Sequence, residues 1–183
     1  METWSEDIIS VERARTLPGL FRERVRRSPE AVAYRAYDRR QEAWRDYTWR
    51  EMARTVARWQ AALAGEALDR GARVALAVRN GPEWVAFDQA ALGLGLVVVP
   101  LYVDDRPDNA AYILRETGAA LLLLQDTSQW EDLRPPAGEL EHLRRVVVLN
   151  SRGPAAFDDE RVRTAGDWLP AADGEPRAEE GRP

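Results

Sequence analysis

The sequence predicts an α/β fold in which a mostly parallel sheet, flanked by helices on both faces, follows an N-terminal β-hairpin. Short apolar segments alternate along the chain with longer segments of helical periodicity, which is typical of strand–helix–strand units. The short segments are apolar at consecutive positions, as expected for strands whose two faces are both covered. With 183 residues, the chain is long enough for one domain with a sizeable core and a tail.

The first predicted elements are a helix and a hairpin. Residues 16–27 carry leucine, phenylalanine and valine at helical spacing, with a threonine suited to the N-cap and Ser28-Pro29 suited to the stop. Residues 31–37 and 43–49 flank the polar turn DRRQE. Two such segments around a polar turn predict a β-hairpin.

Three longer helices are expected after the hairpin. Thr48 and Glu51 form a T-x-x-E capping box, which opens a helix from residue 49 to about residue 68. The next should begin at Pro82, because proline and an acid in the first turn favour a helix start. It runs to residue 93 or 95 and is apolar on almost every side. Another helix begins at Pro107 and ends at a glycine suited to the C-cap.

Four nearly all-apolar segments predict buried strands. They are RVALAV, VVVPLY, ALLLLQ and RRVVVLN, at residues 73–78, 97–102, 120–125 and 144–150. The second is expected to be a central strand, and the apolar helix before it to be covered by more than this chain supplies. A loop rich in proline and acid separates the last two. From residue 151 the chain is polar apart from RTAGDWL and predicts a linker, partly ordered at most.

Composition excludes several classes of function. The net charge of −5 disfavours nucleic acid or an anionic membrane as a general partner, although arginines cluster locally at residues 22–27 and 144–145. No cysteine is present, so disulfides and thiolate chemistry are excluded, and a reducing compartment fits. The N-terminus lacks the pattern of a signal peptide. The longest apolar run, residues 90–103, is shorter than the roughly 20 residues of a membrane-spanning helix.

All 26 basic residues are arginine, and lysine is absent. A GC-rich genome accounts for this bias without a functional cause. The chemical consequence is the same whatever the origin: this chain can form no lysine Schiff base and has neither a lysine general base nor a phosphate-loop lysine.

Two glycine-containing turns are candidates for ligand sites. Gly93-Leu94-Gly95 closes a helix before a strand, whereas a dinucleotide fingerprint needs strand, glycine turn and helix, with a third glycine where Val98 stands. A tight turn explains it better. Arg79-Asn80-Gly81 could bind an anion at a helix start, but capping of the helix by Asn80 or Gly81 explains the same residues.

The remaining polar candidates also have simpler explanations. His142, the only histidine, lies in a charged stretch and is expected at the surface. The pairs Asp104-Asp105 and Asp158-Asp159 are expected to be solvated or to cap helices, with no third ligand nearby in sequence. Core packing explains most of the seven tryptophans. The sequence therefore predicts no catalytic, cofactor-binding or metal residue in this chain.

The order of segments nevertheless resembles a known family. YTWREMARTVARWQAAL, RVALAVRNGPEWVAFDQAALGLGLVVVPLY and PDNAAYILRETGAALLLL are similar to the start of the adenylate-forming (AMP-binding) superfamily, most of all to long-chain fatty-acid-CoA ligases, the acyl-CoA synthetases. The resemblance covers residues 17–150. One departure is Arg106, where family members often place a threonine or serine as N-cap. Asp105 is expected to take that role, and the change costs about 1 kcal/mol at most.

The resemblance implies a reaction whose machinery is not in this chain. Such ligases activate a fatty acid with ATP and Mg²⁺ to an acyl-adenylate and pass the acyl group to coenzyme A. This chain has no counterpart of four features of these ligases. They are the Ser/Thr/Gly-rich phosphate loop ending in Pro-Lys-Gly, the ribose-binding Asp, the Mg²⁺-binding Glu and the C-terminal Lys. The resemblance thus implies a non-catalytic N-terminal fragment without cofactors of its own. ATP, Mg²⁺ and CoA belong to the intact enzyme.

On this interpretation the chain divides into an N-terminal arm (residues 1–15), an α/β subdomain (16–150) and a polar linker (151–183) leading to the missing nucleotide loop. Its partner would be the remainder of the parent ligase, in the cytoplasm, with peripheral membrane association of the parent left open. Apolar faces left exposed, above all on helix 82–95, would drive homo-oligomers. The alternatives are a naturally short binding or partner module that kept the fold, and an unrelated Rossmann-type nucleotide binder.

Overall fold

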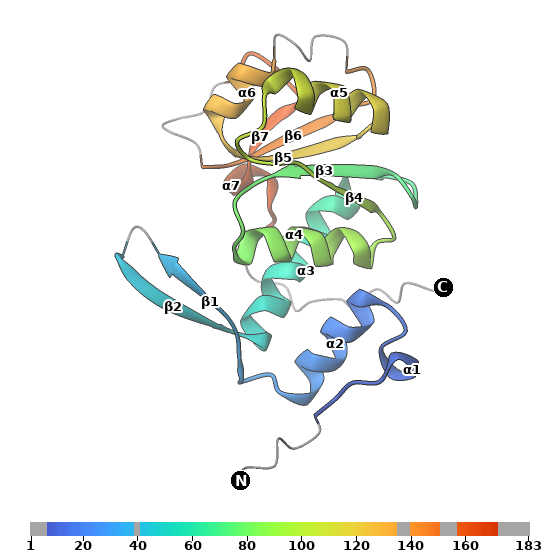
Figure 1. Ribbon diagram of the computed structural model, residues 1–183, viewed down its shortest axis with the longest axis vertical. Helices are drawn as coiled ribbons and strands as arrows, with labels where there is room; N and C mark the ends of the chain where they lie inside the picture. Colours follow the sequence, from blue (N-terminus) through green and yellow to red (C-terminus); the bar gives the residue numbers. More distant parts are fainter. Residues whose placement is uncertain (1–6, 39–40, 135–139, 151–156, 172–183) are drawn as a thin grey trace.

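A five-stranded parallel sheet forms the centre of the computed structural model, which describes residues 7–38, 41–134, 140–150 and 157–171 (Figure 1). The strand order is β4-β3-β5-β6-β7. The strands are β3 (Arg73–Ala77), β4 (Val97–Pro100), β5 (Leu121–Asp126), β6 (Arg145–Asn150) and β7 (Val162–Thr164). A separate antiparallel hairpin pairs β1 (Val32–Asp38) with β2 (Ala43–Thr48). The predicted fold class is confirmed.

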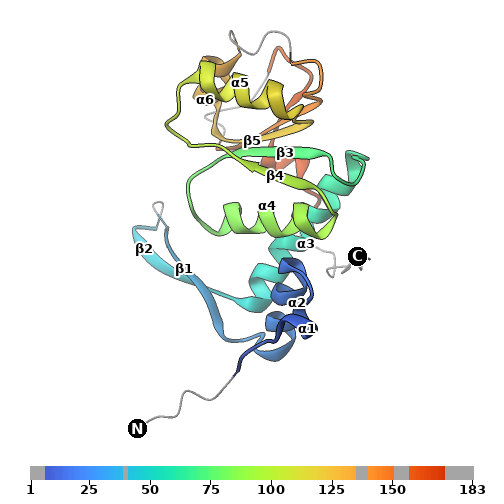
Figure 2. The same ribbon diagram turned by 45° about the vertical axis from the view of Figure 1, so that its right-hand side comes forward.

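Helices cover both faces of the sheet (Figure 2). On one face lie α5 (Pro107–Thr117) and α6 (Thr127–Leu133). On the other lie α3 (Trp49–Gly65), α4 (Pro82–Gly93) and α7 (Ala165–Trp168). Two helices precede the hairpin, α1 (Val11–Ala14) and α2 (Leu17–Arg27). No helix within the described residues is long and apolar enough to cross a bilayer.

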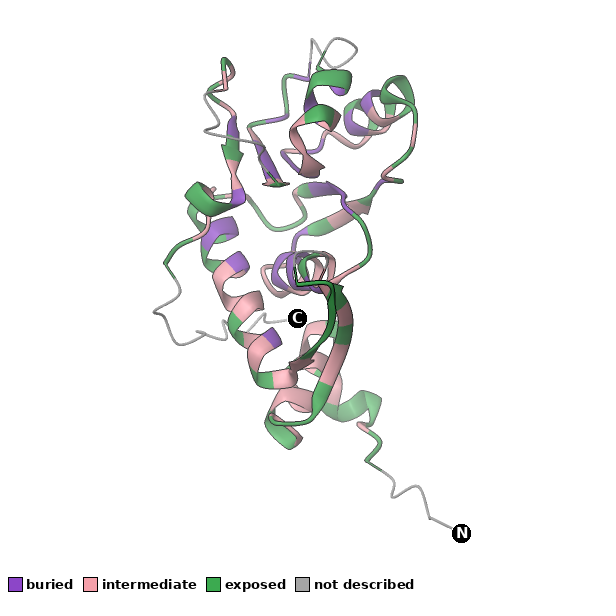
Figure 3. Cartoon of the chain, turned by 90° about the vertical axis from the view of Figure 1, so that its left-hand side faces the viewer, coloured by how far each residue is buried: buried purple, intermediate pink, exposed green. Residues whose placement is uncertain are grey.

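The apolar helix α4 is enclosed by this chain itself. Its buried residues Ala86, Phe87, Ala90 and Ala91 belong to the core beneath the sheet, while α3 and α2 pack on its other sides. None of its apolar residues falls in the exposed class that Figure 3 colours green. A helix that is apolar all round is a buried helix, so its composition needs no further partner. The expected exposure of helix 82–95 is wrong, and homo-oligomers through this face lose their basis.

Three further details differ from expectation. Strand β4 lies at the edge of the sheet and not in its centre, in keeping with Pro100, which cannot donate to a neighbouring strand. Helix α3 ends at Gly65, three residues earlier than predicted. The loop expected after β5 contains α6, opened by a capping box between Asp126 and Gln129.

The sheet also continues beyond residue 150. Strand β7 pairs with β6, and the indole of Trp168 in α7 lies 5.8 Å from that of Trp59, centroid to centroid. Glu66 fixes this segment, because its Oε1 accepts hydrogen bonds of 2.7 Å from both Arg145 Nε and Trp168 Nε1. The described residues 157–171 therefore belong to the domain, which corrects the boundary expected at residue 150. Residues 151–156 and 172–183 lie outside the described residues.

Gly95, in the turn from α4 to β4, has a φ of +74°, and an added Cβ would lie 3.2 Å from the Arg70 guanidinium carbon. Gly95→Ala should lower the free energy of unfolding by about 1–2 kcal/mol, because side chains disfavour this backbone region. Urea denaturation measures the effect. Gly65→Ala is the matched control, since its Cβ meets nothing within 4 Å and lies in a helix. Equal effects at the two positions would contradict the account of this turn.

Candidate functional site

A pocket on the described residues opens at the carboxyl ends of β3, β4 and β5. Its volume is about 420 Å³. From β3 the chain crosses to β4 on one side and then returns to β5 on the other, so β3 and β5 flank a switch point in the strand order. Open α/β sheets bind ligands at the carboxyl edge beside such a point. This position makes the pocket the candidate functional site.

One side chain, Gln129 of α6, ties the three strand ends together. Its Nε2 donates to the backbone carbonyls of Ala77 (3.2 Å) and Val103 (3.3 Å). Its Oε1 accepts from the backbone N–H groups of Gln125 (2.6 Å) and Asp126 (3.3 Å). Both ends of the amide are therefore satisfied, and the floor of the pocket is held by a residue that the sequence reasoning missed, although it belongs to the capping box of α6.

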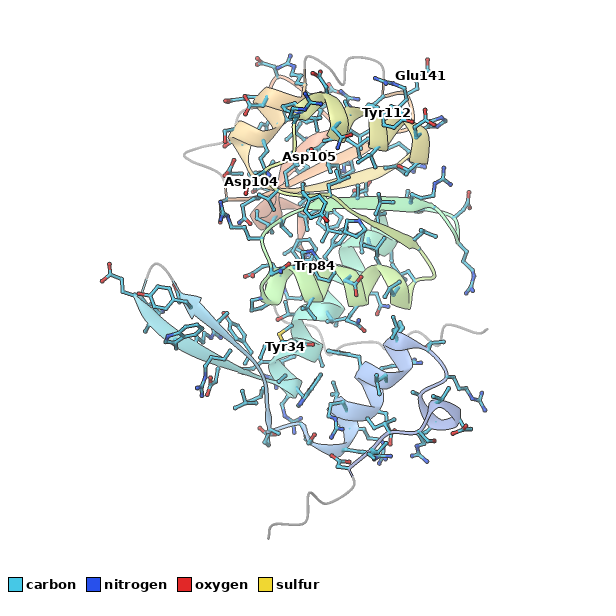
Figure 4. All side chains as sticks on the ribbon, in the orientation of Figure 1. Tyr34, Trp84, Asp104, Asp105, Tyr112 and Glu141 are labelled. Carbon is cyan, nitrogen blue, oxygen red and sulfur yellow. The ribbon has the colours of Figure 1, made fainter. Side chains whose placement is uncertain are left out.

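The pocket carries more acid than base. Carboxylates come from Asp104, Asp105, Asp126 and Asp132, against the single guanidinium of Arg79. Asp126 caps α6, and Asp105 accepts from the backbone N–H of Arg106 at 2.9 Å and from the Asn109 side chain. Among the described residues no group of three or more His, Asp or Glu is placed to hold a metal ion. Figure 4 labels Asp104 and Asp105 in the connection after β4.

Asp105 does not take the N-cap role as expected, because Arg106 is the N-cap residue of α5 and the helix has no side-chain cap. The backbone N–H that Asp105 binds is that of Arg106, which precedes the helix. Of the two residues expected to cap α4, Gly81 is the N-cap residue, without any side-chain cap, and Asn80 does not cap the helix. The backbone N–H of Arg79 is bound by Gln125 Oε1 at 3.0 Å. Of Arg79, Asn80 and Gly81, the turn considered as an anion site, only Arg79 lines the pocket.

The other sequence candidates lie elsewhere. Gly93-Leu94-Gly95 lies at the amino end of β4, opposite the pocket, and exposed His142 precedes β6 at the same edge. Asp159 pairs with Arg161 at 2.8 Å, and this arginine holds the pKa of the carboxyl below its usual value. Asp158 is exposed. The structure does not bring these residues together into one site.

A second polar cluster, missed by the sequence reasoning, lies where α4 meets β1. Burial raises the pKa of Asp88, whose Oδ2 accepts from Gln89 Nε2 at 3.2 Å. The Oε1 of Gln89 is buried without a hydrogen-bond partner among the described residues. Burial also raises the pKa of nearby Tyr34, and Asp88 raises it further. Asp88 and Tyr34 lie on elements far apart in sequence, so no local pattern could have indicated this environment.

Comparison with known proteins gives a consistent result. The sequence model described as "AMP-binding enzyme" matches residues 21–180. The long-chain-fatty-acid–CoA ligase FadD15 of Mycobacterium bovis is 28% identical over 123 residues, which are 67% of this chain but only 20% of that ligase. An uncharacterized protein of Mycobacterium tuberculosis is 27% identical over 150 residues, 81% of each chain. Coronafacic acid ligase of Pectobacterium brasiliense has a similar fold, with a TM-score of 0.72 at 13% identity over 83% of this chain and 29% of that one.

Proposed function

The chain belongs to the AMP-binding enzyme family, and from this premise we propose that it is the N-terminal, non-catalytic portion of a long-chain fatty-acid-CoA ligase. The match of the family model over residues 21–180 carries the proposal. The similarity to FadD15 supports the long-chain class, and the chain spans only a fifth of that ligase. The intact enzyme would convert ATP, a fatty acid and CoA into acyl-CoA, AMP and pyrophosphate through an acyl-adenylate.

Physical chemistry supports a non-catalytic role for this portion. Adenylation requires positive charge placed where charge develops on the phosphates, supplied by lysine, arginine or Mg²⁺. The chain has no lysine, and the pocket at the carboxyl ends of β3, β4 and β5 places four carboxylates beside one guanidinium. Such a pocket repels a triphosphate more than it attracts one. ATP, Mg²⁺ and CoA are therefore assigned to the rest of the parent ligase.

The role that remains is that of a scaffold. The domain is closed on both faces by its own helices and presents its polar pocket at the carboxyl ends of its strands. We assign this carboxyl end of the sheet to the wall of the acyl or CoA channel, with the remainder of the ligase as partner. A cytoplasmic location is part of the same proposal.

A second candidate is a naturally short binding or partner module that kept the fold without ligase activity. One observation favours it: the uncharacterized mycobacterial relative aligns over 81% of its own length. Membership of the AMP-binding family removes the third alternative, an unrelated Rossmann-type binder.

The codons that follow Pro183 in the gene distinguish the two candidates. The ligase proposal expects an open frame that continues into a Ser/Thr/Gly-rich loop ending in Pro-Lys-Gly. A stop codon directly after Pro183 would overturn it in favour of the short module.

A further inference from the structure

Three arginines line the outward side of α3. Arg50, Arg54 and Arg58 follow one another at intervals of four residues, so they share one side of the helix, which we call the arginine face. The opposite side carries the buried Met52 and Trp59. Like charges at this spacing repel one another and disfavour the helix slightly. Negative or hydrogen-bond-accepting groups beside the arginine face would relieve that repulsion.

The segment that follows β7 already binds to the arginine face. The guanidinium of Arg58 donates two hydrogen bonds to the carbonyl of Pro170, from Nε at 3.1 Å and from Nη2 at 3.0 Å. Two residues earlier, the indole of Trp168 donates to the carboxylate of Glu66, the C-cap residue of α3. From Trp168 to Pro170 the chain therefore passes from the carboxyl end of α3 toward its amino end.

Arg54 is the next arginine in this direction. It is exposed and makes no ion pair or hydrogen bond among the described residues, although its charge contributes to the lowered pKa of Glu51. It lies one helical turn, about 6 Å along the axis, from Arg58. Arg50, one turn further, pairs with exposed Glu30 at 2.6 Å. An available guanidinium thus lies just beyond the point where the chain is bound.

Acidic residues follow Pro170 in the sequence. Asp173 and Glu175 come before any basic residue, and residues 172–183 carry four carboxylates against two arginines. An extended chain advances about 3.3 Å per residue, so Asp173 can lie up to about 10 Å from Pro170, enough to span one helical turn. The tether also keeps these carboxylates at a high local concentration beside α3. Charge, reach and chain direction all favour contact with the arginine face.

From these observations we propose that the acidic segment beginning at residue 172 binds along the arginine face of α3. Asp173 would pair with Arg54. Glu175, two residues later, would reach Arg50. An exposed ion pair shifts such an equilibrium by about fivefold at most, so the segment would be held by two pairs and the tether, and released by salt. The inference does not depend on the proposed ligase function.

The absence of cysteine allows a site-specific test on the full 183-residue chain. A spin label attached to Ala178→Cys broadens the amide NMR signals of residues that lie near it. We expect strong broadening at residues 50–58 in low salt and much weaker broadening in about 1 M salt. In Arg54→Glu the ratio of bound to free segment should fall at least about fivefold, because repulsion replaces an ion pair. Adding Asp173→Arg to Arg54→Glu should restore the broadening.

Arg115→Glu is the matched control, because Arg115 is an exposed arginine of α5, on the other face of the sheet. It should leave the broadening of α3 unchanged. The proposal is overturned if α3 shows no salt-sensitive broadening, if Arg54→Glu and Arg115→Glu reduce it equally, or if Asp173→Arg fails to restore it. Broadening between chains, seen when an isotope-labelled chain is mixed with a spin-labelled one, would assign the arginine face to a second copy and would also overturn it.

Discussion

Trp59→Ala should lower the free energy of unfolding by about 4 kcal/mol, close to half of the stability of a typical domain. Trp59 is only 2% exposed, and its ring lies 5.7 Å from Phe87 of α4 and 5.8 Å from Trp168 of α7. Alanine would leave a cavity where α3, α4 and α7 meet, and the surrounding helices could close it only in part. Urea denaturation monitored by circular dichroism measures the change.

Trp44→Ala is the control of identical chemistry. Trp44 lies on the hairpin, is 68% exposed and contacts Tyr37 edge to face. Its replacement should cost less than about 1 kcal/mol. If the two variants lost similar stability, α3 would not pack between α4 and α7 as described. Trp59→Phe, which keeps most of the volume, should lose less than half as much as Trp59→Ala.

Gln129→Leu should have the second largest effect, about 2–3 kcal/mol. Leucine keeps much of the volume but removes the partner of two backbone carbonyls and two backbone N–H groups at the ends of β3, β4 and β5. Each polar group left without a partner costs about 1–3 kcal/mol, and water entering the open pocket restores part of that. The midpoint of urea denaturation reports the loss.

Glu131→Gln, an exposed substitution two residues later on the same helix, should change stability by less than about 0.5 kcal/mol. Native-state hydrogen exchange adds a second measurement. In Gln129→Leu, the backbone amides of Gln125 and Asp126 should exchange faster, because they lose their acceptor. Unchanged exchange at these two amides would show that Gln129 does not hold the floor of the pocket.

Most of the fold could be predicted because local patterns and tertiary structure agree in this chain. The capping box of Thr48 and Glu51, the proline starts of α4 and α5, and Gly118 at the end of α5 each act as predicted. Two of the misses also had a local signal. Pro100 marks β4 as an edge strand, and Asp126 with Gln129 forms the capping box that opens α6.

The other misses depend on contacts distant in sequence. Strand β7 has only three residues and exists through its pairing with β6, and α7 is held by Glu66, about a hundred positions earlier. The pocket arises from the ends of three strands that only the strand order brings together. The resemblance to a family predicted the fold, which the structure confirms, but it did not indicate this pocket.

We propose above all that this chain supplies the scaffold of an adenylate-forming ligase. The groups that stabilise charge on the phosphates would lie in the remainder of the parent ligase. Palmitate-dependent exchange of labelled pyrophosphate into ATP measures adenylation directly and needs no CoA. The purified 183-residue chain with ATP, Mg²⁺ and palmitate should show no exchange above a protein-free control. Exchange at a rate within tenfold of that of full-length FadD15 under the same conditions would contradict the claim.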